Sequence, residues 1–335
     1  MKTKVRSGKF SETVMQLTCC MILFGIAGWC QAATYYKIGQ DGYNKSSFSG
    51  NVSSSVGWSS VSSTSKTTDP TIDFENSDFI IKGSAVMRTP ANGGSCTFAG
   101  QSLLLRAGGT ITLKNANGAT ITFPNLVFEN GIIGHGGVEV LNTLAGAFKI
   151  TPGTYACFGA DDIRTLVVTA TVEGDETTVI RNSLGNALFK FHNLGNFFGV
   201  FKCEDTTAVP GPSTIMLDGP FNGRLGELTS TNMNLCINYE GLPPGKGLRV
   251  EVPSEALKTN LKFFGANTDF LTDGLPILRF PAGTEINPDD FVIAVASSAD
   301  DAEETVLKLR TYVDAADANA VVLAVKHAGP IIIIN

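Results

Sequence analysis

Short runs of alternating apolar and small polar residues recur along the middle of the chain. Thr110–Leu113, Thr120–Phe123 and Thr165–Val172 are examples. Alternation with a period of two is typical of β-strands that bury one face and expose the other. Gly and Asn pairs separate the runs, as at Gly108-Gly109 and Asn117-Gly118, and these residues tolerate the backbone of tight corners. The pattern predicts a chain that is almost entirely β-strand.

Helical periodicity is nearly absent, and the best helix candidate is the short segment Ser254–Thr259, with Ser254 as its N-cap. Two β architectures then compete. A β-sandwich binding module predicts antiparallel hairpins with strands of about five to six residues. A parallel β-solenoid predicts shorter strands, several in each coil, with Gly and Asn at the corners.

The spacing of the runs favours the solenoid. Between residues 80 and 180, strand starts recur every ~8–10 residues, as expected for several short strands per coil. We therefore predict an all-β protein with a right-handed parallel β-helix, or solenoid, over residues 79–250. A β-rich C-terminal cap is predicted over residues 251–335. Most of the 21 Phe residues are expected to point inward and to stack between coils.

Composition and charge exclude several classes of protein. Charged residues make up 17% of the 335 residues, against ~25% in an average soluble domain. Apolar residues, at 43%, are too frequent for a disordered chain. A formal net charge of −6 excludes nucleic-acid binding driven by bulk charge. The low charge content fits solenoid faces built from Thr, Ser and Asn.

The first 32 residues have the three-part layout of a secretory signal peptide. Basic residues between Lys2 and Lys9 precede the mostly apolar run Val14–Trp29, and Cys30–Ala32 offers small residues for cleavage after Ala32. An uncleaved membrane anchor is the alternative, but this run of 16 residues is shorter than the ~20 that span a bilayer. We predict that residues 1–32 are removed, that the mature chain has no transmembrane segment, and that the protein is secreted or held at the cell surface.

Residues 33–78 are predicted to form a Ser/Thr-rich N-terminal segment and cap. Fourteen of the 23 residues from Ser46 to Thr68 are Ser or Thr, which is too polar a composition to bury a core. Trp58 lies inside this stretch. Its large apolar ring is expected to stack on the end of the solenoid as part of the cap.

Four cysteines remain after removal of the signal peptide, namely Cys96, Cys157, Cys203 and Cys236. An even number in an exported chain allows disulfides, with three possible connectivities. Their spacings match no metal-binding or redox pattern. The alternative is that they are buried thiols that pack as small apolar groups.

An ordered series of motifs resembles one family. The series consists of Met87–Ala91, Phe98–Leu103, Gly109–Lys114, Phe123–Leu126, Leu144–Gly146 and Arg164–Val168. It resembles exported bacterial β-helix proteins related to autotransporter passengers, which carry autotransporter-associated β-strand repeats. The resemblance covers residues 58–200 and implies a β-helix and export, but no chemistry. Unlike autotransporters proper, the chain shows no C-terminal β-barrel domain.

Three fragments bear on a polysaccharide-degrading alternative. They are His135 between Gly134 and Gly136, the pair Asp161-Asp162, and Asn267–Asp269 followed by Asp289-Asp290. Polygalacturonase-like enzymes use closely placed carboxylates together with a Gly-flanked His. The order of the fragments differs from that family's, because His135 comes first in this chain. The structural interpretation is that His135 lies at a corner and that the Asp pairs cap turns.

Asp161, Asp162 and Arg164 form a weak acidic and basic cluster. On an alternating strand Asp162 and Arg164 share one face, as the Ca²⁺ ligands and base of a lyase would require. An ordinary surface ion pair gives the same pattern. The three His residues are isolated, with no metal-binding spacing. We predict no catalytic residue, no metal site and no cofactor.

The sequence therefore predicts a secreted or cell-surface structural or adhesive β-solenoid protein with no catalytic activity. The expected partners are surface polysaccharide or other cell-surface proteins, and no nucleic acid. The alternative is a carbohydrate-binding or polysaccharide-degrading β-helix. That alternative predicts carboxylates that converge on one face beside an aromatic side chain.

Overall fold

The computed structural model describes residues 32–38, 57–65, 71–90, 93–135, 141–160, 164–184, 187–205, 213–228, 233–265, 272–300 and 305–326. The chain divides into two units, Met1–Ala33 and Thr34–Asn335. Residues 1–31 of the predicted signal peptide lie outside the described residues, so the fold concerns the second unit. Across the described ranges, we find no helix with the length and apolar character needed to cross a membrane.

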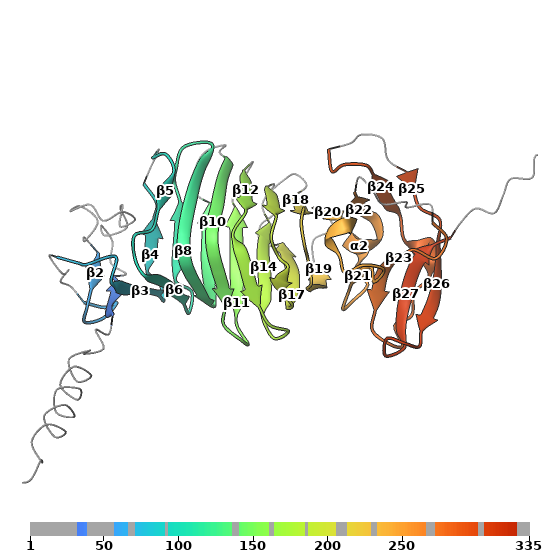
Figure 1. Ribbon diagram of the computed structural model, residues 1–335, viewed down its shortest axis with the longest axis horizontal. Helices are drawn as coiled ribbons and strands as arrows, with labels where there is room; N and C mark the ends of the chain where they lie inside the picture. Colours follow the sequence, from blue (N-terminus) through green and yellow to red (C-terminus); the bar gives the residue numbers. More distant parts are fainter. Residues whose placement is uncertain are drawn as a thin grey trace, which may run out of the picture. The chain divides into compact units, whose positions relative to one another are not determined.

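The described chain is a β-solenoid of about seven turns, with 55% strand and 4% helix (Figure 1). The predicted all-β parallel solenoid is confirmed. Strands from successive coils stack in three rows, and neighbours within each row pair in parallel. The first row contains β5 (Cys96–Thr97), the first half of β8 (Ala119–Glu129), the first half of β10 (Leu141–Ile150), β12 (Thr165–Val168), β15 (Leu188–Phe191), β18 (Ser213–Leu217), β20 (Met233–Asn238), β22 (Leu261–Phe264) and β24 (Ile293–Ala296).

The other two rows complete each coil. The second row contains β3 (Ser77–Lys82), β6 (Ser102–Arg106), the second halves of β8 and β10, β13 (Thr171–Gly174) and β16 (Asn196–Phe197). The third row contains β4 (Val86–Arg88), β7 (Thr110–Leu113), β9 (Gly131–His135), β11 (Tyr155–Ala160), β14 (Val179–Leu184), β17 (Val200–Asp205) and β19 (Arg224–Leu228). β8 and β10 therefore each cross from the first row to the second.

The register shows the length of one coil. Leu103 pairs with Leu126, and Thr165 pairs with Leu188, in both cases 23 residues further on (126 − 103 and 188 − 165). Each coil thus places one strand about 4.8 Å above the last in each row. A side chain at a given position along a strand then lies directly above its counterpart one coil earlier.

A continuous chain of Phe rings fills the interior. Adjacent rings lie 5.3 to 6.4 Å apart between centroids, and most contacts are edge-on or tilted, as the quadrupoles of aromatic rings favour. In order of contact, the rings belong to Phe79, Phe98, Phe123, Phe148, Phe128, Phe158, Phe191, Phe201 and Phe221. All nine are buried. The predicted inward stack of Phe side chains is confirmed.

An antiparallel pair lies at the N-terminal end of the stack. β1 (Ala33–Lys37) pairs with β2 (Trp58–Ser59), and β1 lies beside β3. The Trp58 ring is fully buried and meets Phe79 edge-on at 4.8 Å between centroids. Trp58 therefore belongs to the cap, as its position in the Ser/Thr-rich stretch predicted.

Antiparallel strands also end the stack at its C-terminal side. β21 (Leu248–Arg249) pairs in parallel with β23 (Pro276–Phe280), which pairs antiparallel with β27 (Ala320–Val325), and β27 pairs with β26 (Leu309–Asp314) (Figure 1). β24 pairs antiparallel with β25 (Thr305–Val306). The parallel first row continues through β22 and β24, beyond residue 250, where the sequence placed the end of the solenoid. The short helices among the described residues are η2 (Tyr239–Gly241), α2 (Glu255–Thr259) and η3 (Pro288–Asp290).

Candidate functional site

The predicted acidic and basic cluster is only partly within the described chain. Asp161 and Asp162 lie outside the described residues. Arg164 is described, and its guanidinium donates a hydrogen bond of 2.9 Å to the backbone carbonyl of His135 in β9. Arg164 therefore links two successive coils. The predicted pairing of Arg164 with Asp162 stays a prediction, because Asp162 lies outside the described residues.

His135 is the last residue of β9, and its side chain points into the core with 1% of its surface exposed. Among the residues that the structure describes, neither ring nitrogen has a hydrogen-bond partner. Burial, together with the nearby positive charges of Arg164 and Lys114, lowers the pKa of His135 to about 4. The imidazole is therefore neutral at pH 7. A ring enclosed in this way does not reach a substrate, so His135 acts in the structure of the solenoid.

We expect acid to destabilise the protein through His135. In the unfolded chain the imidazole has its ordinary pKa of 6.5, against about 4 when folded. Between pH 6.5 and pH 4 the unfolded state binds more protons than the folded state. The contribution of neutral His135 to the free energy of unfolding is therefore fully present above pH 6.5 and decreases as the pH drops towards 4. The total loss is about 3 kcal/mol.

Urea unfolding at pH 7.5, 6, 5 and 4.5 measures this loss. His135→Phe removes the titrating group. Between pH 7.5 and 4.5 the variant should therefore lose about 3 kcal/mol less stability than the natural chain. His192→Phe is the matched control, because His192 is partly exposed and lies beside Asp218. Equal pH dependence in the natural chain and in His135→Phe would contradict this account.

The other carboxylates considered from the sequence occupy turns or undescribed segments. Asn267–Asp269 lies outside the described residues. Asp289 and Asp290 lie in η3, where the Asn287 side chain accepts a hydrogen bond from the Asp289 backbone and donates one of 2.8 Å to Asp290. The interpretation of this pair as turn residues agrees with these contacts.

The structure holds all four cysteines as thiols. Cys157 in β11 and Cys203 in β17 are separated by β14, or two strand spacings of about 4.8 Å, which exceeds the ~7 Å Cα separation that a disulfide spans. Five strands of the first row separate Cys96 in β5 from Cys236 in β20. The described geometry therefore favours the alternative of packed thiols over disulfides between these pairs.

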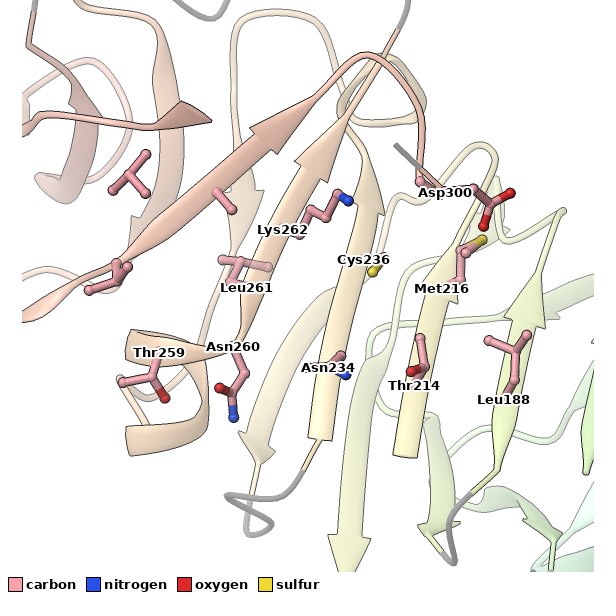
Figure 2. A pocket seen from close by; sticks show the side chains of 14 residues that line it. Leu188, Thr214, Met216, Asn234, Cys236, Thr259, Asn260, Leu261, Lys262 and Asp300 are labelled. Carbon is pink, nitrogen blue, oxygen red and sulfur yellow. The ribbon is translucent and has the colours of Figure 1, made fainter. Parts of the chain in front are cut away.

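A groove of about 590 Å³ lies on the outer side of the first row, over β15 to β24 (Figure 2). Hereafter we call it the first-row groove. It is lined by Leu188, Thr214, Met216, Asn234, Cys236, Thr259, Asn260, Leu261, Lys262, Val292, Ala294, Ala299, Asp300 and Val306.

The register explains why most of these side chains meet. Leu188, Thr214 and Asn234 are paired across β15, β18 and β20, and they form one column. Met216, Cys236, Lys262 and Ala294 form a second column, two residues further along the strands. Their neighbours in sequence, such as Ile215 and Leu235, point inward and are buried. Figure 2 shows the two columns side by side, with Asp300 at one edge.

The lining mixes polar and aliphatic side chains. Within the described residues it contains two Asn amides, two Thr hydroxyls, the Lys262 amine and the Asp300 carboxylate among aliphatic side chains. Within the described ranges, His, Cys, Asp and Glu side chains form no group of three or more able to hold a metal ion.

This groove was not predicted from the sequence. Outward strand positions were expected to carry Thr, Ser and Asn, whereas the columns also contain the aliphatic side chains of Leu188, Met216 and Ala294. The sequence did contain one indication of the groove, because the outward positions of Met233–Asn238 carry both polar and apolar residues. Only the register between coils shows that these positions adjoin. Comparison with protein-family models, with curated proteins and with solved structures gave no match to this chain.

Proposed function

We propose that this protein is a secreted or cell-surface structural and adhesive β-solenoid without catalytic activity, and that it holds its partner in the first-row groove. Export is supported by the signal-peptide pattern of residues 1–32. The partner is a surface polysaccharide or another cell-surface protein.

The first support is the architecture. Parallel coils stacked on a continuous Phe core form a repetitive scaffold, in which each coil packs on its neighbours. Antiparallel pairs lie at both ends of the stack. Such strands cover the ladder edges through which solenoids would otherwise associate end to end. The long sides of the stack are then the surfaces available for binding.

The observation that carries the proposal is the chemistry of the first-row groove. Its columns place Asn amides and Thr hydroxyls beside aliphatic side chains, which suits hydrogen bonding and apolar contact with one ligand. Among the residues that the structure describes, the Asp300 carboxylate is the one acidic group of this lining.

A blocking substitution tests the proposal. Ala294→Trp places a large ring in the groove, and Ala145→Trp places the same ring at an outward position of β10 on the same row, outside the groove lining. The purified chain is immobilised and exposed to envelope proteins and to surface polysaccharides, with product formation recorded in parallel. We expect retention by the natural chain and by Ala145→Trp, and about tenfold weaker retention by Ala294→Trp.

Each outcome has a defined meaning. Retained material that is digested by protease identifies a protein partner, and protease-resistant material identifies a polysaccharide, and both agree with adhesion. New reducing ends or unsaturated products would overturn the non-catalytic assignment. Equal binding by the two Trp variants would remove the first-row groove from the proposal.

A further inference from the structure

A second groove, of about 410 Å³, lies where the chain enters β17, β19 and β21, beside β23. None of its residues lines the first-row groove, so the two can be tested separately. Hereafter we call it the basic groove. It is lined by Phe198, Phe221, Asn222, Gly223, Leu242, Pro243, Lys246, Gly247, Arg249, Arg279 and Asp317, all within the described residues.

Two cations give this groove its charge. Lys246 is exposed between Gly245 and Gly247, both of which have φ of +67°. Its ammonium has no hydrogen-bond or ion-pair partner among the residues that the structure describes. Arg249 in β21 is also exposed, and its guanidinium donates one hydrogen bond, to the backbone carbonyl of Asn222. Further N–H groups of Arg249 therefore remain for a ligand.

The third cation of the groove, Arg279, is paired with two carboxylates. Arg279 lies beside Arg249 in the register of β21 and β23. It is 6% exposed and donates hydrogen bonds of 2.9 Å to Asp314 and to Asp317. Its Nε also donates to the backbone carbonyl of Lys246 at 3.1 Å. Arg279 thus fixes the turn that carries Lys246. Arg279 and its two carboxylates together carry a charge of −1, so Lys246 and Arg249 leave the region with a net charge of +1 (three cations minus two carboxylates).

An exposed aromatic ring lies on the same groove. Phe198 is 44% exposed, although the neighbouring Phe197 and Phe201 are buried. Phe221, Leu242 and Pro243 add apolar lining. A ring of this kind offers a flat apolar surface, and the two cations offer donors for a carboxylate.

We propose that the basic groove binds an acidic polysaccharide built from uronic acid residues. The apolar face of a pyranose ring packs on Phe198, and its carboxylate pairs with Arg249 and Lys246. The forked guanidinium of Arg249 suits the two oxygens of a carboxylate. A volume of about 410 Å³ is within the usual range for small-ligand sites, and here it holds a short stretch of the polymer.

Binding of the purified chain to three polymers tests the inference. Polygalacturonate carries both the sugar ring and the charge, dextran carries the ring alone, and poly-glutamate carries the charge alone. We expect the chain to bind polygalacturonate, with an affinity that falls as NaCl is raised, and to bind the other two at least tenfold more weakly.

Substitutions in the lining of the basic groove test whether the polysaccharide binds there. Arg249→Gln and Lys246→Gln should each weaken polygalacturonate binding about tenfold, since each removes a charge-assisted contact. Phe198→Ala should weaken it about fivefold. Arg88→Gln removes the same charge from exposed Arg88 in β4, and it should bind like the natural chain. Circular dichroism and thermal melting confirm that each variant is folded.

Three results would overturn the inference. Equal affinity for poly-glutamate would show attraction of charge without recognition of sugar. Equal affinity for dextran would show that the protein does not recognise the carboxylates of polygalacturonate. Unchanged binding by folded Arg249→Gln and Lys246→Gln would place any polysaccharide site elsewhere. Because Ala294→Trp leaves the basic groove intact, loss of first-row binding in that variant does not affect this test.

Discussion

Gly146→Ala is expected to lower the free energy of unfolding by about 4 kcal/mol. Gly146 lies in β10 at φ +111°, a backbone conformation that residues with a Cβ rarely adopt. A Cβ at this position would lie 1.9 Å from the carbonyl oxygen of Phe123 in the preceding coil. The strand must therefore move away from β8, at the point where their register already shifts.

Two other glycines provide matched controls. Gly153 also has a positive φ, of +74°, but no atom lies within 4 Å of the position that a Cβ would occupy, so Gly153→Ala should cost about 1 kcal/mol. Gly94 has open space and no such φ, and Gly94→Ala should be close to neutral. Urea unfolding followed by circular dichroism measures the free energy of unfolding of the three Gly→Ala variants. A loss in Gly146→Ala no larger than in Gly153→Ala would show that the contact with β8 relaxes freely.

Phe128→Ala is expected to cost about 3–5 kcal/mol, because it leaves a cavity in the middle of the ring stack. The Phe128 side chain is fully buried in β8. Its ring contacts Phe148 and Phe158 in the next coil, at 5.9 and 5.8 Å between centroids. In a solenoid each coil is stabilised mainly by its neighbours, so the loss should concentrate in the coils of β8, β10 and β11.

Hydrogen exchange and denaturant unfolding together measure the size and the place of this effect. Faster exchange should appear first in β8, β10 and β11. Phe198→Ala is the matched control, because the same atoms are removed from a ring that is 44% exposed, and it should cost less than about 1 kcal/mol. A Phe128→Ala variant as stable as Phe198→Ala would mean that the ring stack does not hold the coils together.

The sequence by itself determined the class of the fold. Alternation in runs such as Thr110–Leu113 marks strands, since a period of two is a local property of a strand. The strands form where these runs lie, with Ile111 and Leu113 buried. The inward Phe residues and the capping role of Trp58 were also predictable, because most large apolar rings of a folded chain are buried, with Phe198 as an exception.

Only the tertiary structure decided which outward side chains meet. Asn234 lies beside Thr214, and Lys262 beside Cys236, through pairings between strands about one coil apart. Local periodicity does not contain this register, so neither the first-row groove nor the basic groove could be found from it. The orientation of the His135 side chain could not be predicted from local periodicity either. Its flanking glycines suggested a corner, but the register of β9 with β7 and β11 turns its ring into the core. Strand formation follows from short-range patterns, whereas sites on a solenoid follow from how successive coils align.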